Sequence, residues 1–342
     1  MSEAQPNPSM SREPGPSAGN SPILSLRGVR KHFPAARSLL GRPKTWVRAV
    51  DGVDLDVMPG ETLGLVGESG CGKSTLGRVA IRLYRPTEGR VLFEGEDISH
   101  ASSAALRPLR RRMQIIFQDP YSSLNPRMTV RAMIAEAMWL HGFLPDAREE
   151  ESKVGDLLER VGLRREHMRR YPHEFSGGQR QRIGIARALA VQPRFIVCDE
   201  PISALDVSIQ AQIVNLLMDL QDELGLSYLF VAHDLQVVEY VSHRVAVMYL
   251  GRIVELAPAA GIYAEPLHPY TQALLSAVPT PDPLAKHDRI VLEGDVPSPL
   301  SPPTGCSFHP RCRSAEQGLC DRLRPPLIEL RPGHQVACHL AR

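Results

Sequence analysis

A short glycine-rich string, placed between an apolar strand and a helical segment, sets the fold of this 342-residue chain. The strand is the run ETLGLVG, and the string has the spacing Gly, four residues, Gly-Lys-Ser. Glycines let backbone N–H groups and the helix N-terminus face phosphate oxygens, while the lysine reaches the outer phosphates and the serine can bind Mg²⁺. A turn that merely joins a strand to a helix does not need the whole pattern. The predicted phosphate-binding residues are Gly67, Ser69, Gly70, Cys71, Gly72, Lys73, Ser74 and Thr75.

Two carboxylates end a second apolar strand, the run FIVCDE. Asp199 suits a role at a Mg²⁺ ion, and Glu200 suits a general base for an attacking water. Taken alone, such a strand would be an ordinary capped strand. Together with the glycine-rich string, it predicts a site that hydrolyses a nucleotide.

The composition excludes several classes of function. Lysine and arginine number 40 and aspartate and glutamate 38, so the net charge of +2 lacks the basic excess of a nucleic-acid-binding protein. Mean hydropathy is −0.18, and no apolar stretch approaches the roughly 20 residues of a membrane-spanning helix. The N-terminus lacks the basic-then-apolar order of a secretory signal. We therefore expect a folded, cytosolic chain with no nucleic-acid partner.

The pattern along the chain predicts an α/β fold with two additions. Residues 1–22 are rich in Pro, Ser, Gly and Asn, which predicts a disordered leader. Residues 23–257 alternate β-like runs with stretches of helical period, which predicts a largely parallel central sheet. A helical block at about 120–176 predicts an inserted helical subdomain. Residues 258–342 hold 14 of the 30 prolines and four of the six cysteines, which predicts a small irregular extension.

Further motifs accompany these two in a fixed order. Gln118 lies in the run FQDP, Phe175 is followed by Ser-Gly-Gly-Gln, Ser-Ala-Leu-Asp follows the carboxylates, and His233 follows SYLFVA. This order resembles that of ABC-type ATPases over about residues 23–257. Phe175 stands where that family most often has leucine, which keeps an apolar anchor. The resemblance implies a P-loop NTPase that hydrolyses ATP. It adds Gln118, Ser176, Gly177, Gly178, Gln179, Asp206 and His233 to the expected site.

The Ser-Gly-Gly-Gln string is the family's signature motif. A serine and two glycines at a helix start form an anion-binding surface, because free N–H groups and the helix dipole favour a phosphate. In the family, the signature of one subunit faces the P-loop of another. The resemblance therefore implies a head-to-tail dimer in which Ser176, Gly178 and Gln179 act in trans, while Asp206 helps to align the two sites.

The resemblance also implies the groups around the γ-phosphate. Gln118 is similar to the residue that senses the γ-phosphate and Mg²⁺, and His233 is similar to the switch histidine, although a histidine that ends a buried strand is more often a core residue. The expected catalytic residues are Glu200, His233 and Gln118, and the expected Mg²⁺ ligands are Ser74, Gln118 and Asp199.

An aromatic residue upstream of the P-loop stacks on adenine in this family. Phe33 lies at that place, and its alternative role is that of a core residue. The following run PAARSLLGRPKTW resembles an insertion, and it brings Trp46 as a competing stacking residue. We favour Phe33.

The C-terminal quarter of the sequence indicates which subfamily of ABC-type ATPases the chain resembles. The runs HPYTQALLSAVPTPDP and RIVLEGDVPSPLSPPTGCSFHPRC resemble the C-terminal extension of oligopeptide and dipeptide importer ATPases, a subfamily with relatives for nickel and glutathione. This implies a peripheral motor subunit at the cytoplasmic face of the inner membrane that energises peptide uptake, with nickel or glutathione as the alternative substrate. The implied partners are a homologous second ATPase or a second copy, two permease subunits and an extracytoplasmic solute-binding protein.

Four cysteines in this extension form a candidate metal site: Cys306, Cys312, Cys320 and Cys338. A cytosolic compartment disfavours disulfides, and the lack of a CxxC pair weakens a zinc ribbon. Four thiolates that converge can hold an iron-sulfur cluster, and some peptide-importer ATPases are thought to carry a four-iron, four-sulfur cluster here. The alternatives are unliganded thiols, or zinc with His309, His334 or His339 replacing a ligand.

Two other classes of function fit less well. A non-transport ABC ATPase that acts on DNA or ribosomes would carry a long coiled-coil insertion or two fused cassettes, and this chain has neither. A redox protein built on the cysteines would not need the complete set of ATPase motifs. The sequence therefore favours a transport ATPase.

Overall fold

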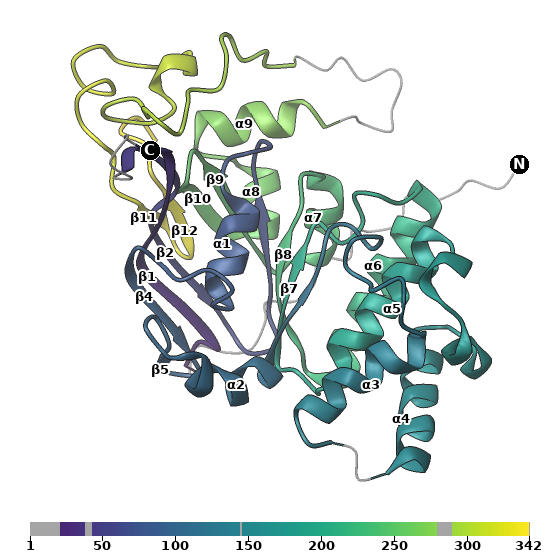
Figure 1. The fold of residues 1–342 in the computed structure, drawn as a ribbon. Coiled ribbons are helices and arrows are strands. Elements are labelled where there is room, and N and C mark those ends of the chain that lie inside the picture. Colours follow the sequence, from purple (N-terminus) through teal and green to yellow (C-terminus); the bar gives the residue numbers. More distant parts are fainter. Residues whose placement is uncertain (1–20, 38–42, 144–145, 279–288, 342) are drawn as a thin grey trace, which may run out of the picture.

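The computed structural model describes residues 21–37, 43–143, 146–278 and 289–341, and it contains two β-sheets with helices on and between them (Figure 1). Within these residues the larger sheet has eight strands in the order β11-β12-β10-β9-β3-β8-β7-β6. The strands from β9 to β6 pair in parallel, and β10, β12 and β11 continue the sheet by antiparallel pairing. This confirms the predicted parallel centre. Its strands are β3 (Thr62–Val66), β6 (Met113–Ile116), β7 (Phe195–Asp199), β8 (Ser227–Val231), β9 (Arg244–Tyr249), β10 (Arg252–Pro258), β11 (Ile328–Arg331) and β12 (His334–Val336).

The smaller sheet is antiparallel, in the order β2-β1-β4-β5. Most of the run ILSLRGV lies in strand β1 of this sheet and not in the parallel one. The alternating pattern predicts a strand, but it does not predict which sheet the strand joins. The residues on both sides of the expected insertion pair with each other as parts of β1 and β2, and residues 38–42 between them lie outside the described residues. Nearly all of the predicted leader also lies outside the described residues. Its strands are β1 (Leu24–Arg37), β2 (Pro43–Val57), β4 (Glu88–Phe93) and β5 (Glu96–Asp97).

Helix α1 lies between the two sheets, where it contacts β1, β2, β7 and β8 (Figure 1). Helices α3 and α4 and two 3₁₀ turns lie between β6 and β7 in the chain and form a separate helical lobe with α5. In the described parts of the chain, we find no helix long and apolar enough to cross a bilayer. The helices are α1 (Lys73–Ala80), α2 (Ser103–Arg112), α3 (Val130–Leu140), α4 (Ala147–Arg160), η1 (Arg165–Arg169), η2 (Pro172–Glu174), α5 (Gly177–Leu189), α6 (Val207–Leu224), α7 (Leu235–Val241), α8 (Ala259–Ala264), α9 (Pro269–Ser276) and η3 (His309–Arg311).

The larger sheet is buried on both faces. In β7, Phe195 and Val197 point into the core beneath the smaller sheet, whereas Ile196 and Cys198 point into the core beneath the helices. Such double burial requires an unbroken apolar run. Since β3, β7 and β8 are parallel, their C-terminal ends lie at one edge, where the predicted motifs begin.

The C-terminal extension is anchored in the core as well as added to the sheet. Its Tyr270 and Phe308 are fully buried against Tyr249 of β9, with ring centroids 4.7 to 5.4 Å apart. The fully buried carboxylate of Glu255 in β10 lies 2.7 Å from Nε2 of His334 in β12. The sequence did not predict the strands β11 and β12. Between its short elements the extension is irregular, as expected (Figure 1, yellow).

Candidate functional site

A pocket of about 510 Å³ opens where β3, β7 and β8 end. It brings together most of the predicted phosphate-binding residues and the three predicted catalytic residues, which come from four separate places in the sequence. The residues that line it are Val47, Ala49, Ser69, Gly70, Gly72, Lys73, Ser74, Thr75, Gln118, Glu200, His233 and Pro299.

The phosphate-binding loop leaves no room for side chains at two of its glycines. Gly72 has a φ of +110°, and a Cβ there would lie 2.0 Å from the carbonyl oxygen of Ala49. Gly67 has a φ of +150°, and a Cβ there would lie 2.2 Å from a backbone oxygen. Only glycine fits either position. Cys71 is buried within the loop, and this burial raises the pKa of its thiol, as expected of a packing residue.

Lys73 is the first residue of α1 and is 4% exposed. Its Nζ donates to the carbonyl oxygens of Gly67 at 2.7 Å and Glu68 at 3.1 Å. The ammonium group is therefore held inside the loop, at the place where phosphate oxygens would replace these carbonyls as acceptors.

Asp199 ends β7 and is 1% exposed. Its Oδ2 lies 3.2 Å from Nη2 of Arg78 in α1. Its Oδ1 is buried and has no hydrogen-bond partner among the residues that the structure describes. A buried carboxylate oxygen without a donor fits a metal ligand, because leaving it unpaired is otherwise costly.

Glu200 is the centre of the catalytic group. Gln118 donates from Nε2 to Oε2 of Glu200 at 2.8 Å, and Nδ1 of His233 lies 3.4 Å from the same oxygen. Glu200 has a φ of +49°, in the left-handed region that residues with side chains rarely adopt, and its N–H donates to Val231 of β8 at 3.0 Å. Strained backbone of this kind is typical of functional sites. The His233 side chain is 60% exposed, so this histidine is not a core residue.

The signature residues lie apart from this pocket. Ser176 caps α5: its Oγ accepts from the N–H of Gln179 at 3.4 Å, while Oε1 of Gln179 accepts from the N–H of Ser176 at 3.1 Å. A Cβ on Gly178 would lie 2.5 Å from Cγ2 of Ile209, so α5 and α6 approach closely there. Neither the signature residues Ser176, Gly177, Gly178 and Gln179 nor Asp206, which precedes α6, line the pocket described above.

Phe33 lies in β1 with its ring packed edge-to-face on Tyr84 at 5.6 Å and with Nζ of Lys31 4.9 Å from its centroid. It does not line the pocket, although its partner in the sheet register, Val47, does. Trp46 is 43% exposed and does not line the pocket either. The structure therefore places both candidate stacking residues beside the pocket rather than in it.

Comparisons with known proteins agree with this arrangement. A family model described as ABC transporter matches residues 50–203, and one described as the C-terminal region of oligopeptide/dipeptide transporters matches residues 254–320. The oligopeptide transport ATP-binding protein AppF of Bacillus subtilis is 55% identical over 326 residues, which cover 94% of this chain and 98% of that protein. The chain belongs to the ATP-binding proteins of the oligopeptide/dipeptide ABC transporter family. It is thus an ABC ATPase, which hydrolyses ATP to energise transport.

Two further similarities support the family and the fold. The putative oligopeptide transport ATP-binding protein YkfD of Bacillus subtilis is 54% identical over 323 residues, covering 94% of this chain and 96% of that protein. A solved dimeric structure of the ATP-binding cassette MJ0796, in a post-hydrolysis state bound to ADP and Pi, is similar with a TM-score of 0.62 and 27% identity. That similarity covers 69% of this chain and 99% of the solved chain.

The four C-terminal cysteines of the ATPase lie near one another. All six cysteines are in the described part of the chain and are free thiols. The backbone N–H of Cys306 donates to the oxygen of Cys320 at 2.8 Å. Burial raises the pKa of the Cys306 thiol, and the nearby thiols of Cys338, Cys312 and Cys320 raise it further. Across the described residues, however, no three His, Cys, Asp or Glu side chains converge tightly enough to hold a single metal ion.

The three histidines considered as zinc ligands are all bonded elsewhere. Nδ1 of His309 lies 2.9 Å from the carbonyl oxygen of Cys306, and Nε2 of His339 lies 2.9 Å from that of Leu323. His334 is paired with Glu255, as described above. These contacts disfavour a mixed cysteine and histidine site.

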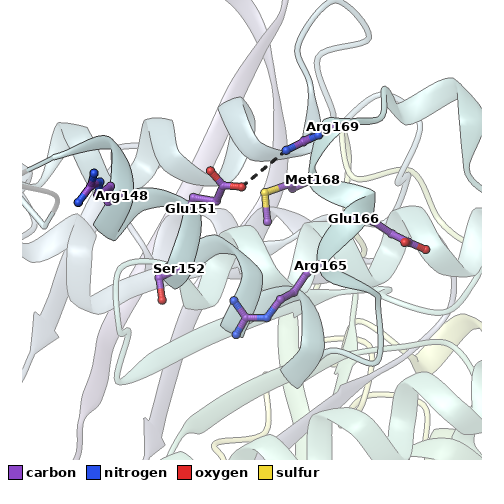
Figure 2. A pocket seen from close by; sticks show the side chains of 7 residues that line it. All are labelled: Arg148, Glu151, Ser152, Arg165, Glu166, Met168 and Arg169. Atoms are coloured by element: carbon purple, nitrogen blue, oxygen red, sulfur yellow. Dashed lines mark ion pairs between the residues drawn. The ribbon is translucent and has the colours of Figure 1, made fainter.

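A second pocket, also of about 510 Å³, lies in the helical lobe between α4 and η1 (Figure 2). Two of its three arginines pair with carboxylates of the same lobe: Arg169 lies 3.9 Å from Glu151, and Arg165 bonds Glu159 at 2.9 Å. It has no glycine-rich loop, so we assign the nucleotide to the first pocket. The residues that line the second pocket are Arg148, Glu151, Ser152, Arg165, Glu166, Met168 and Arg169.

Sequence reasoning missed the residues that complete the nucleotide pocket from outside its motifs. Val47 and Ala49 of β2 supply an apolar wall, and Pro299 of the extension joins them, held by a hydrogen bond of 3.0 Å from the N–H of Arg48 to its oxygen. Arg78 was also missed. Its place four residues, about one helical turn, after the P-loop serine Ser74 is a signal that could have linked it to the Mg²⁺ side of the site, where Asp199 lies.

Proposed function

We propose that this ATPase binds Mg-ATP in the P-loop pocket, hydrolyses it with Glu200 as general base, and so energises the import of peptides. The convergence of Gln118, Glu200 and His233 beside Lys73 carries the proposal, because it gathers a base, its positioning groups and a phosphate-binding cation at one pocket. The phosphate-binding set is Gly67, Ser69, Gly70, Cys71, Gly72, Lys73, Ser74 and Thr75.

The residues present fit a Mg²⁺ ion. Ser74 offers a hydroxyl in the pocket, Gln118 offers an amide oxygen, and Asp199 offers the unpartnered Oδ1. Oxygen donors of this kind are those that Mg²⁺ prefers. When bound, the ion would neutralise charge on the β- and γ-phosphate oxygens. Arg78 holds the other oxygen of Asp199.

Each catalytic residue has a separate role in hydrolysis. Glu200 accepts a proton from the water whose oxygen bonds to the γ-phosphorus as the bond to the ADP oxygen breaks. Gln118 donates to Oε2 of Glu200 and so orients the carboxylate, and His233 lies beside the same oxygen. Lys73 stabilises charge on the outer phosphates.

We propose that the signature residues act on a second subunit's nucleotide. Ser176 is exposed at the N-terminus of the 13-residue helix α5 and lies outside the chain's own pocket, which leaves its anion-binding surface available to a partner. Next to Asp206, Val207 is 81% exposed and therefore also accessible to a partner. The similar MJ0796 cassette was solved as a dimer, which supports a paired arrangement.

The assignment of a peptide substrate and of the remaining partners is based on the family to which the chain belongs. AppF and YkfD are named for oligopeptide transport, and residues 254–320 of this chain match the model of the C-terminal region of oligopeptide/dipeptide transporters. We therefore propose a peripheral subunit on the cytoplasmic face of the membrane, paired with a homologous ATPase or a second copy, and served by two permeases and an extracytoplasmic solute-binding protein. The ATPase domain would span 23–257, with the helical subdomain at about 120–176 and the extension at 258–342. Phe33 remains our candidate for adenine stacking.

The uptake of labelled peptides tests the substrate class. In cells that lack this chain, we expect uptake of di- and oligopeptides to fall to background and the wild-type chain to restore it. The control variant Glu223→Gln should restore uptake as well, because Glu223 lies on α6 in an exposed ion pair with Arg160 of α4. Unchanged peptide uptake together with a loss of nickel or glutathione uptake would contradict the peptide assignment and leave the ATPase assignment intact.

We also propose that Cys306, Cys312, Cys320 and Cys338 hold an iron-sulfur cluster. The four thiols lie near enough to raise the pKa of Cys306 and Cys312, and this proximity supports the proposal. Anaerobically purified protein should contain iron and acid-labile sulfide in about a four-to-four ratio per chain. Cys312→Ser should lose both, whereas Cys198→Ala, in the buried strand β7, should lose neither. Zinc alone, or no metal, would refute the cluster.

A further inference from the structure

We propose that Arg311, in the C-terminal extension, is a positioning residue for the phosphate-binding loop, because its guanidinium orients and neutralises Glu68 within that loop. The inference rests on the proposed nucleotide site and extends it to a part of the chain outside the ATPase motifs. Arg311 closes η3, 243 residues after Glu68.

The contact between the two side chains is bidentate. Nη1 of Arg311 donates to Oε2 of Glu68 at 2.8 Å, and Nη2 donates to Oε1 at 3.1 Å. The Arg311 side chain is only 8% exposed and that of Glu68 is 26% exposed. A paired fork of this kind fixes orientation as well as distance, and burial protects it from the screening that weakens surface pairs.

Every polar group of Glu68 is bound. Besides the carboxylate, its backbone N–H donates to the hydroxyl of Tyr270 in α9 at 2.8 Å, and its carbonyl oxygen accepts from Nζ of Lys73. Glu68 itself does not line the pocket, but the next residue, Ser69, does. Holding Glu68 at three points therefore sets the position of the loop that faces the phosphates.

The groups that hold Glu68 are themselves held by the core. Tyr270 and Phe308 pack against each other at 5.4 Å and against Tyr249, and all three are fully buried. Phe308 directly precedes η3, so the position of Arg311 is set by a packed aromatic cluster and not by a free loop. The extension thus acts on the loop as a rigid support.

The charge of Glu68 gives this support a specific effect on the nucleotide. A carboxylate inside a loop that binds phosphates repels them, and Arg311 supplies the opposite charge beside it. Removing Arg311 alone leaves an uncompensated and partly buried carboxylate near the phosphates. Removing Glu68 as well takes that charge away. A purely structural role for Arg311 predicts no such recovery.

The affinity of the full-length protein for Mg-ADP, measured by calorimetry, tests the proposal. Arg311→Met should weaken binding about tenfold, as expected for loss of one charge-assisted pair. Glu68→Gln should stay within about threefold of wild type, and so should the double variant Arg311→Met with Glu68→Gln, because both lack the repelling carboxylate and keep the backbone contacts of residue 68 with Tyr270 and Lys73. Arg311→Lys, which keeps the charge but loses the fork, should lie between wild type and Arg311→Met. Arg331→Met is the matched control, because Arg331 pairs with Glu265 in the same extension but on the exposed surface.

Three outcomes would overturn the inference. The first is that Arg311→Met binds Mg-ADP like wild type, and the second is that the double variant binds as weakly as Arg311→Met. The third is that the loss of affinity follows the iron and zinc content of the variants, which is measured in parallel because Cys312 is adjacent to Arg311. If Arg311→Met does not fold, as judged by thermal melting, the comparison of Arg311→Lys with and without Glu68→Gln carries the test. A wild-type protein that fails to bind Mg-ADP would instead refute the proposed nucleotide site.

Discussion

Exchanging Glu200 for glutamine is expected to reduce the kcat of ATP hydrolysis by about 10² to 10⁴-fold while leaving ATP affinity within about threefold of wild type. Glutamine has the size of glutamate but cannot accept the proton of the attacking water. Its amide still fits beside Gln118 and His233, whose nearest atoms lie 2.8 and 3.4 Å from Oε2 of Glu200, so the pocket should keep its shape. Phosphate release under saturating Mg-ATP measures the effect.

The matched control for this substitution is Glu223→Gln. Glu223 lies on α6 and is half-exposed beside Arg160, far from the pocket-lining residues, and its variant should hydrolyse ATP at the wild-type rate. Normal phosphate release by Glu200→Gln would refute the general-base assignment. A loss of ATP affinity equal to the loss of turnover would show instead that Glu200 acts in binding.

Exchanging Lys73 for alanine should raise the Kd for Mg-ATP by about 100-fold or more, since it removes two or more charge-assisted contacts to the phosphates. Hydrolysis at ordinary ATP concentrations should then be lost as well. The buried ammonium group is bonded to the carbonyls of Gly67 and Glu68. Among the described residues that line the pocket, Lys73 is the only lysine or arginine. Equilibrium binding of a fluorescent ATP analogue gives the measurement.

A lysine on the helical lobe provides the control here. Lys153 of α4 pairs with Glu149 on the surface, so Lys153→Ala should bind and hydrolyse ATP like wild type. Together the two substitutions separate the steps of the reaction: Lys73→Ala should fail to bind, whereas Glu200→Gln should bind and fail to turn over. If Lys73→Ala bound ATP normally, the pocket would not be the nucleotide site.

The motifs could be predicted from the sequence because each one combines a backbone geometry with a chemical group in a short stretch. The strand before Gly67 and the strand ending at Asp199 are short, mostly apolar and buried along their whole length, which places both motifs at strand ends. Parallel strands end at one edge, so the convergence of Lys73, Glu200 and His233 follows from local patterns and the predicted fold class.

The contributions of the extension could not be predicted in this way. Strands β11 and β12 have four and three residues and mostly polar side chains, and a strand that short has no periodicity to detect. The contacts of Arg311 with Glu68 and of Pro299 with Arg48 join segments more than two hundred residues apart. Neither partner signals the other, because long-range pairing depends on how the whole chain packs.

Glu68 of the phosphate-binding loop and its partner Arg311 are 243 residues apart, so they are synthesised at different times. Ribosomes add about 5–20 residues per second, so Arg311 is made roughly 12–50 s after Glu68. Throughout that interval the nascent ATPase carries its glycine loop with an unneutralised carboxylate. High-affinity nucleotide binding would then begin only when the last elements have docked, which ties occupation of the site to completion of the polypeptide.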